Sequence, residues 1–162
     1  MLKVLTYNNE LLKEKSEKVD KIDKEIKELA NNMFKTMYFS NGIGLAGVQV
    51  GVLKRIFVID VPDIGKYVMI NPVILERSKN ISVYEEGCLS LPGISHEVER
   101  SNLITVEYQD LDGKKQKLEA SDLLATCIQH EYDHLEGILF IDRLDPEEKL
   151  KMLKDYNKLH IV

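Results

Sequence analysis

Two histidines four positions apart, His130 and His134, are the residues of this sequence best suited to chemistry. On an α-helix such residues lie on one face about one turn apart, so both imidazoles could bind a single metal ion. Glu131 follows the first histidine and is placed to accept a proton from a metal-bound water rather than to bind the metal. Two surface histidines with this spacing by chance are the alternative. Histidine is scarce, however, with four in the chain, so the pattern favours a metal site.

The histidine pair needs at least one further protein ligand, and a catalytic site also needs an open position for water. Metzincin proteases take a third histidine six residues after the second, where this sequence has Phe140. Thermolysin-like proteases take a glutamate from a later helix, and the 28 residues after His134 leave little room for one. Glu147 and Glu148 stay open as ligands, but we expect the third ligand upstream.

The upstream candidates for the third ligand are Cys88, Cys127, His96 and several carboxylates. Cys127 lies three residues before His130 on the same helical stripe, so we expect it to line a pocket beside the metal, with a small buried residue as the equal alternative. His96 is more simply interpreted as a surface or hydrogen-bonded histidine than as a ligand. The glycines and the proline around Cys88 indicate a shaped loop rather than a regular strand. A thiolate offered from a loop can reach a metal held by a helix, so we favour Cys88 as the ligand.

Helices at both ends of the chain and a β-rich middle are predicted to position these residues. Apolar residues spaced by three and four predict an amphipathic helix over residues 22–39. Ser121 is a candidate N-cap, and Gly137 a candidate C′ residue, for the helix that carries the histidines. The tail from 147 to 159 is predicted to be a helix of mixed charge.

The middle of the chain alternates apolar and polar residues between turn signals. Asn71 and Pro72 are expected to divide one β-rich stretch into two strands, and Asp112 with Gly113 to turn a hairpin. The predicted strands are 55–60, 67–70, 73–76, 103–108 and 114–118. We therefore expect one α+β domain over residues 1–162, with mixed or antiparallel sheets around a central metal-binding helix and with N-terminal and C-terminal helices.

The composition narrows the class of protein. A chain of 162 residues, 44% hydrophobic and 30% charged, is typical of a soluble globular domain. The net charge of −5, without a long basic run, argues against specific nucleic acid as a ligand. No stretch resembles a signal peptide or approaches the roughly 20 apolar residues of a membrane span, so a cytoplasmic protein without membrane contact is expected. The two cysteines indicate packed or metal-bound thiols rather than a disulfide framework.

Three segments, in order, resemble the motifs of the peptide deformylase family. Residues 42–49 resemble the first, Gly-x-Gly-Leu-Ala-Ala-x-Gln, with Gly47 where the family usually has alanine. Residues 86–90 match the second, Glu-Gly-Cys-Leu-Ser, and residues 129–134 match the third, Gln-His-Glu-x-x-His. The match spans at least residues 42–134, and the methyl missing at Gly47 removes no reacting group.

The resemblance implies a hydrolase that removes the formyl group from the N-terminal formyl-methionine of new bacterial or organellar proteins and releases formate. It implies that Cys88, His130 and His134 bind one divalent metal ion, with water in the fourth position, and that Glu131 carries the protons. Fe²⁺ is suggested as the metal in the cell, with Zn²⁺, Ni²⁺ or Co²⁺ in purified protein, since a Cys/His₂ donor set suits all of them.

The same resemblance suggests how the substrate is held. The Leu89 backbone N–H and the Gln49 side-chain amide would stabilise charge on the formyl oxygen together with the metal. The peptide backbone would pair with exposed main chain, and an apolar slot would take the methionine. Arg100 would contact the substrate or brace the Cys88 loop, with a surface salt bridge as the alternative. The residues expected to bind the substrate are Ile43, Gly44, Tyr84, Gly87, Arg100, Leu123, Thr126 and Cys127. For the four slot residues, Tyr84, Leu123, Thr126 and Cys127, plain core packing is the equal alternative.

The implied partners are nascent N-formylmethionyl polypeptides, met by a monomer in the bacterial cytoplasm or in an organellar stroma or matrix. A transient ribosome contact by the C-terminal helix stays open, although Glu147, Glu148 and Asp155 dilute its lysines. Two other classes remain alternatives. A metalloprotease of another lineage would need a ligand other than Cys88, and a non-enzymatic metal-binding module would need a fourth protein ligand.

Overall fold

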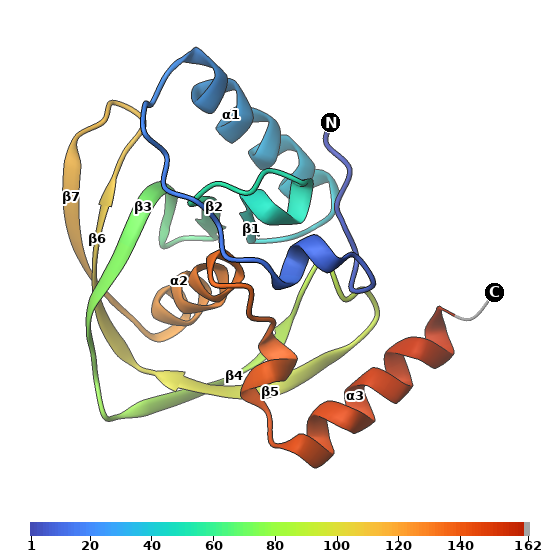
Figure 1. The fold of residues 1–162 in the computed structure, drawn as a ribbon. Coiled ribbons are helices and arrows are strands. Elements are labelled where there is room, and N and C mark those ends of the chain that lie inside the picture. Colours follow the sequence, from blue (N-terminus) through green and yellow to red (C-terminus); the bar gives the residue numbers. More distant parts are fainter. Residues whose placement is uncertain (161–162) are drawn as a thin grey trace.

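A central helix, α2, contacts the strands of two antiparallel sheets in the computed structural model, which describes residues 1–160 (Figure 1). The helices are α1 (Lys24–Phe39), α2 (Asp122–Leu135) and α3 (Pro146–Leu159), with short 3-10 turns η1 (Glu10–Lys13), η2 (Gly47–Val50) and η3 (Phe140–Arg143). The strands are β1 (Gly44–Ala46), β2 (Ile56–Val61), β3 (Gly65–Arg77), β4 (Ile81–Gly87), β5 (Ser95–Ser101), β6 (Leu103–Gln109) and β7 (Lys115–Ser121). The predicted α+β class is confirmed.

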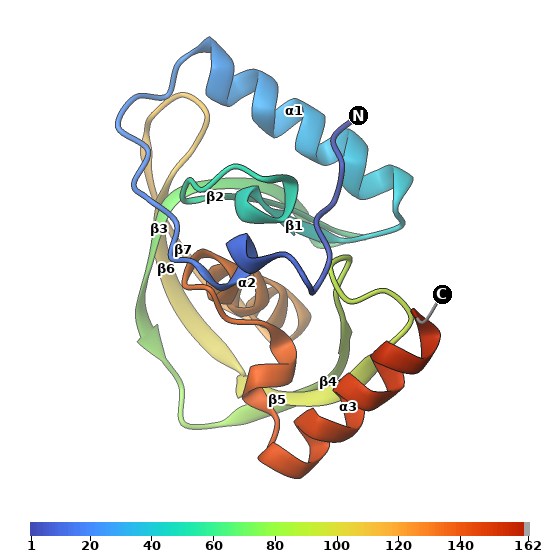
Figure 2. The same cartoon turned by 45° about the vertical axis from the view of Figure 1, so that its right-hand side comes forward.

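The larger sheet has the order β1-β2-β3-β6-β7, and β4 pairs with β5 in the smaller one. All neighbouring strands are antiparallel. The alternation of side chains along β2 explains why this sheet is covered on both faces. Ile56 and Val58 pack with the buried residues of α1, whereas Phe57 and Ile59 pack with those of α2. Figure 2 shows α1 above and α2 below the part of the sheet formed by β1 and β2.

The prediction of two strands around Asn71 and Pro72 was wrong, because β3 runs through both residues. The register with β6 shifts between Ile70 and Val73, and Asn71 takes a positive φ of 51°. Such a bulge accommodates a proline, which has no N–H for the ladder. The Asn71 side chain also accepts from Val19 N and donates to Val19 O, both at 2.8 Å, so the bulge is anchored to the N-terminal segment.

The smaller sheet was not predicted, and it corrects the expected loop around Cys88. Glu85, Glu86 and Gly87 are the last residues of β4, so the loop begins at Cys88 itself. Most side chains of β4 and β5 are exposed or only partly buried. The apolar alternation that reveals a strand is therefore weak in both.

Helix α2 begins and ends where the sequence predicts. Ser121 occupies the N-cap, although its side chain makes no capping hydrogen bond; the Asp122 N–H bonds to the Asn102 carbonyl at 2.9 Å. Gly137 follows the C-cap with a φ of 76°, which favours glycine at C′. Nearly all residues of α2 are buried, since both sheets cover it.

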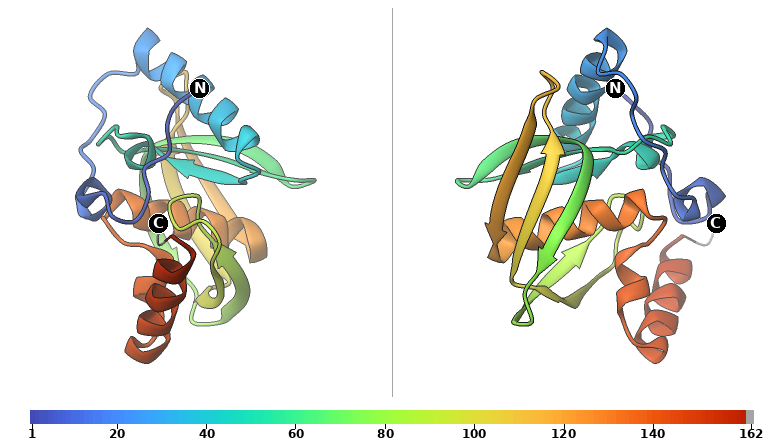
Figure 3. Two further views of the ribbon diagram at one scale, coloured as in Figure 1. Left: turned by 90° about the vertical axis from the view of Figure 1, so that its right-hand side faces the viewer. Right: turned by 60° about the vertical axis from the view of Figure 1, so that its left-hand side comes forward.

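The two outer helices lie at opposite ends of the molecule. Figure 3 shows α1 at one end and α3, drawn in red, at the other. Helix α3 begins at Pro146 after the N-cap Asp145, close to the predicted start at 147. Its Met152 and Tyr156 pack with Leu91, which lies in the loop after Cys88. Within residues 1–160, no helix is both long enough and apolar enough to span a membrane.

Candidate metal centre and substrate pocket

Cys88, His130 and His134 converge although they come from different elements. The histidines project from α2, and Cys88 comes from the loop that leaves β4. One donor atom from each residue lies within 4.8 Å of the others. The Cys88 Sγ lies 3.3 Å from the His134 Nε2. One thiolate and two imidazoles form a soft donor set that suits a divalent transition metal with one position left for water.

The alternative ligands lie elsewhere. Phe140, at the position of the third metzincin histidine, stacks on the His130 ring with centroids 6.2 Å apart. Glu148 is bound to His96 at 2.9 Å between α3 and β5, outside the Cys/His₂ cluster. Within the described chain, Cys88, His130 and His134 are the one close group of metal-ligating side chains.

The electrostatics of Cys88 favour the metal-binding form of its thiol. Burial raises the pKa of Cys88, but the charge of His134 and hydrogen bonds from both histidines outweigh burial and lower the pKa to about 5. Cys88 is therefore a thiolate at neutral pH, and the thiolate is the form that binds metals. The contrast with Cys127 is large, because burial raises the pKa of that thiol to about 12.

Glu86 orients the first histidine. Its Oε1 lies 2.8 Å from the His130 Nδ1, and both residues are buried. A hydrogen bond at Nδ1 leaves Nε2 as the free donor atom, an arrangement common among metal-binding histidines. Hydrogen bonds from His130 and Arg100 outweigh the effect of burial and hold the pKa of Glu86 below its ordinary value.

Arg100 contacts Glu86 and does not line the pocket that opens in front of the Cys/His₂ cluster. Its Nε and Nη2 donate to the two Glu86 oxygens at 2.7 and 3.0 Å, and its Nη1 donates to Asp133 at 2.9 Å. Arg143 closes the network by donating twice to Asp133, at 3.0 and 2.8 Å. Arg100 is 6% exposed, so it is not in a surface salt bridge. Of the expected roles, bracing the segment before Cys88 agrees with these contacts.

Glu131 presents an unpaired carboxylate oxygen beside the donor set. The side chain is buried, and its Oε1 has no hydrogen-bond partner within the described chain. A methyl group at Gly44 would clash with the other oxygen, so the close approach of β1 depends on that glycine. Burial raises the pKa of Glu131, against the opposing charges of His130 and His134. Such a carboxylate suits general-base chemistry on a water held nearby.

Gln49 and Leu89 lie on the Cys88 side of the pocket. The buried Gln49 accepts from Ala46 N at 2.9 Å, which fixes its amide plane. Its Nε2 donates to the Ser90 Oγ at 3.1 Å and lies 3.5 Å from the Cys88 Sγ. Leu89 directly follows Cys88 and lines the same pocket. A polar N–H group beside the donor set is thereby held in one orientation.

A pocket of about 670 Å³ opens in front of this centre. Strand β1 ends the larger sheet and β4 has β5 as its partner, so among the described residues each strand keeps an unpaired edge. Both strands contribute residues to the pocket, and an extended peptide could add to such edges. All residues expected to bind substrate except Arg100 line it: Ile43, Gly44, Tyr84, Gly87, Leu123, Thr126 and Cys127.

Two features of the pocket were not predicted from the sequence. The role of Glu86 was missed, although it lies two residues before Cys88 in the second motif. Ser40 and Asn41, at the end of α1, also line the pocket and were not among the expected site residues. The positive φ of Asn41, 60°, turns the chain from α1 towards β1.

Comparisons with known proteins agree on one family. Residues 1–150 match the family model described as polypeptide deformylase. Peptide deformylase from Wolbachia sp. subsp. Drosophila simulans is 49% identical over 156 residues, covering 89% of this chain and 87% of that protein. The enzyme from Rhizobium meliloti is 48% identical over 152 residues, covering 91% and 87%. The structure of peptide deformylase from Ehrlichia chaffeensis in complex with actinonin superimposes with a TM-score of 0.94 at 38% identity, covering 99% and 98%. That of the Thermotoga maritima enzyme gives 0.87 at 42% identity, covering 90% and 99%.

Proposed function

The chain belongs to the peptide deformylase family, and on that premise we propose how its own residues carry out the reaction. It is a hydrolase that removes the formyl group from the N-terminal formyl-methionine of newly made proteins and releases formate.

Cys88, His130 and His134 hold one divalent metal ion. Supporting this assignment are the 4.8 Å cluster of donor atoms and the lowered pKa of the thiol. When bound, the metal acidifies a water molecule and polarises the formyl oxygen. The softness of the set suits Fe²⁺ in the cell and Zn²⁺, Ni²⁺ or Co²⁺ in purified protein.

Glu131 moves the protons. Its unpaired, buried oxygen accepts a proton from the attacking water, whose oxygen bonds to the formyl carbon. As the carbon–nitrogen bond breaks, Glu131 returns that proton to the leaving amine, and the products are formate and a free N-terminus. The raised pKa of Glu131 supports both transfers, because a general base works best with a pKa near the operating pH.

Gln49 and Leu89 stabilise the charge that develops on the formyl oxygen. Ala46 and Ser90 hold the Gln49 amide in place, and its second Nε2 hydrogen, directed at the Cys88 Sγ 3.5 Å away, turns to the formyl oxygen as the charge forms. The Leu89 backbone N–H follows Cys88 directly and joins it from the same side. A fixed donor of this kind typically lowers the activation free energy by about 2.7–4 kcal/mol.

Nascent formylated polypeptides bind in an extended form. Their backbone pairs with the edges near Ile43, Gly44 and Gly87, and the methionine side chain enters a slot lined by Leu123, Thr126, Cys127 and Tyr84. Arg100 positions the site through Glu86 rather than touching the substrate.

We infer that residues 1–162 form one catalytic domain that works as a monomer in the cytoplasm, or in a stroma or matrix if eukaryotic. A transient ribosome contact through α3 would bring the enzyme to its substrate. Neither a membrane nor a specific nucleic acid is expected as a partner.

The observation that carries the proposal is the unpaired Glu131 carboxylate beside the Cys/His₂ donor set. The test combines metal analysis with formate release from a formyl-methionyl peptide. We expect one bound metal per chain and stoichiometric formate. Cleavage of an internal peptide bond without formate would indicate a protease, and bound metal with neither product would indicate a binding module.

A further inference from the structure

The hydroxyl of Thr126 is buried without a partner. The residue is 3% exposed, and its Oγ1 makes no hydrogen bond within the described chain. A helical threonine has a local partner available, because its hydroxyl can donate to the carbonyl four residues back. Thr36 in α1 does so, donating to Asn32 O at 2.9 Å. Because an unpaired buried hydroxyl is costly and uncommon, the free Thr126 hydroxyl needs an explanation.

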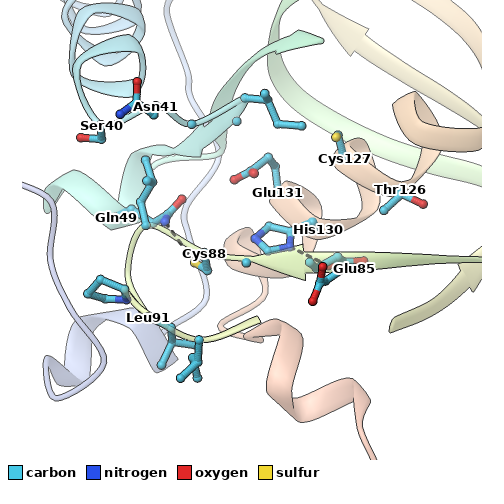
Figure 4. Close-up of a pocket in the computed structure, with 18 of the residues that line it drawn as sticks. Ser40, Asn41, Gln49, Glu85, Cys88, Leu91, Thr126, Cys127, His130 and Glu131 are labelled. Carbon is cyan, nitrogen blue, oxygen red and sulfur yellow. Dashed lines mark hydrogen bonds and ion pairs between the residues drawn. The ribbon is translucent and has the colours of Figure 1, made fainter. Parts of the chain in front are cut away.

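Thr126 lies in the wall of the pocket, away from the reacting atoms. It is four residues before His130, on the same helical face, and lines the pocket next to Cys127. Figure 4 shows Thr126 and Cys127 on the opposite side of Glu131 and His130 from Cys88. A group bound here would be the first side chain of the substrate rather than its formyl group.

A threonine side chain can offer such a ligand either of two surfaces. Its methyl and hydroxyl branch from one carbon, and rotation of χ1 by one staggered step brings the hydroxyl to the position that the methyl held. The neighbouring wall carries no charge, because Leu123 is apolar and the Cys127 thiol, with a pKa raised by burial to about 12, stays protonated. The Thr126 hydroxyl is therefore the strongest hydrogen-bond donor on this part of α2.

We propose that Thr126 sets the specificity of the slot, so that the enzyme also deformylates chains that begin with formyl-methionine sulfoxide. The sulfoxide has the length of methionine but carries an oxygen that must accept a hydrogen bond when buried. The Thr126 hydroxyl donates that bond, while its methyl faces an unoxidised methionine. This inference rests on the proposed function and adds a second substrate class to the same site.

The test compares two peptides that differ only in the oxidation of the first residue. The readout is the ratio of kcat/KM for the sulfoxide to kcat/KM for methionine within each variant. Thr126→Val keeps the shape and removes the hydroxyl, so the ratio should fall about tenfold, as expected for a buried hydrogen bond. Thr126→Ser keeps the hydroxyl, and its ratio should stay within about twofold of that of the unchanged chain. An unchanged ratio in Thr126→Val, or equal falls in both variants, would overturn the proposal.

A binding measurement separates this inference from the proposed function. In a Glu131→Gln background, calorimetry gives the Kd of each formylated peptide without turnover. Adding Thr126→Val should weaken sulfoxide binding about tenfold relative to methionine binding. If the unchanged chain released no formate from either peptide, the proposed function would fail, and the ratio of the two Kd values would still decide the role of Thr126. Equal Kd ratios with and without Thr126→Val would reject it.

Discussion

The Glu86 carboxylate and the His130 imidazole are joined by a buried hydrogen bond of 2.8 Å between Oε1 and Nδ1. Arg100 donates to both Glu86 oxygens and thereby holds the carboxylate in the orientation that meets His130. The orientation of one proposed ligand thus depends on an arginine that does not line the pocket.

Glu86→Gln should weaken metal binding. The amide cannot hold His130 as firmly and leaves the Arg100 charge poorly compensated, so we expect metal affinity to fall about 10–100-fold. Titration against a competing chelator measures the change. Glu99→Gln, an exposed glutamate on β5, is the matched control and should bind metal as the unchanged chain does. Equal affinity in Glu86→Gln would refute the orienting role.

Cys88→Ser should lose most of its metal and nearly all formate release, because a hydroxyl is a harder and far less acidic donor than a thiol. Cys127→Ser should keep its metal, since that thiol lies in the slot. Metal analysis of the two purified variants decides the point. The reverse pattern would mean that the ligand has been misassigned.

In the metal-free protein, iodoacetamide should modify Cys88 far faster than Cys127 at pH 7. The pKa of Cys88 is lowered to about 5 and that of Cys127 is raised to about 12. The reactive thiolate of Cys88 should therefore appear as the pH rises through 5 and stay plentiful above it, whereas Cys127 stays protonated. Mass spectrometry of digests from pH 4 to 8 follows both sites. Equal labelling at pH 7 would contradict the difference, and bound metal should protect Cys88.

Glu131→Gln should separate turnover from binding. The amide keeps the size of the carboxylate but cannot accept a proton, so the rate should fall about 10²–10⁴-fold, near the upper end because two transfers are lost. Metal content and the Kd for a formyl-methionyl peptide should stay near those of the unchanged chain. A parallel loss of metal and rate would make Glu131 a ligand, or a support for one, and the mechanism would be withdrawn.

The parts that the sequence predicted correctly have local causes. The spacing of His130 and His134 needs only the geometry of one helix, and Gly137 ends that helix through its own backbone. The contacts of Glu86 and Arg100 could be identified only from the three-dimensional structure, because they join β4, β5 and α2. Strands β4 and β5 were missed since few of their side chains are buried. The β3 bulge was read as a break because Pro72 ordinarily interrupts a ladder.

The proposed ligands come from two parts of the chain, with Cys88 leaving β4 and the histidines on α2. A metal held by all three is a removable cross-link between the smaller sheet and the central helix. Since the unfolded chain has no such site, thermal stability should rise with free metal concentration, by about 2.7 kcal/mol at a hundredfold excess over Kd. A chelator would therefore take away rigidity as well as activity, and metal supply would help set how long each folded molecule lasts.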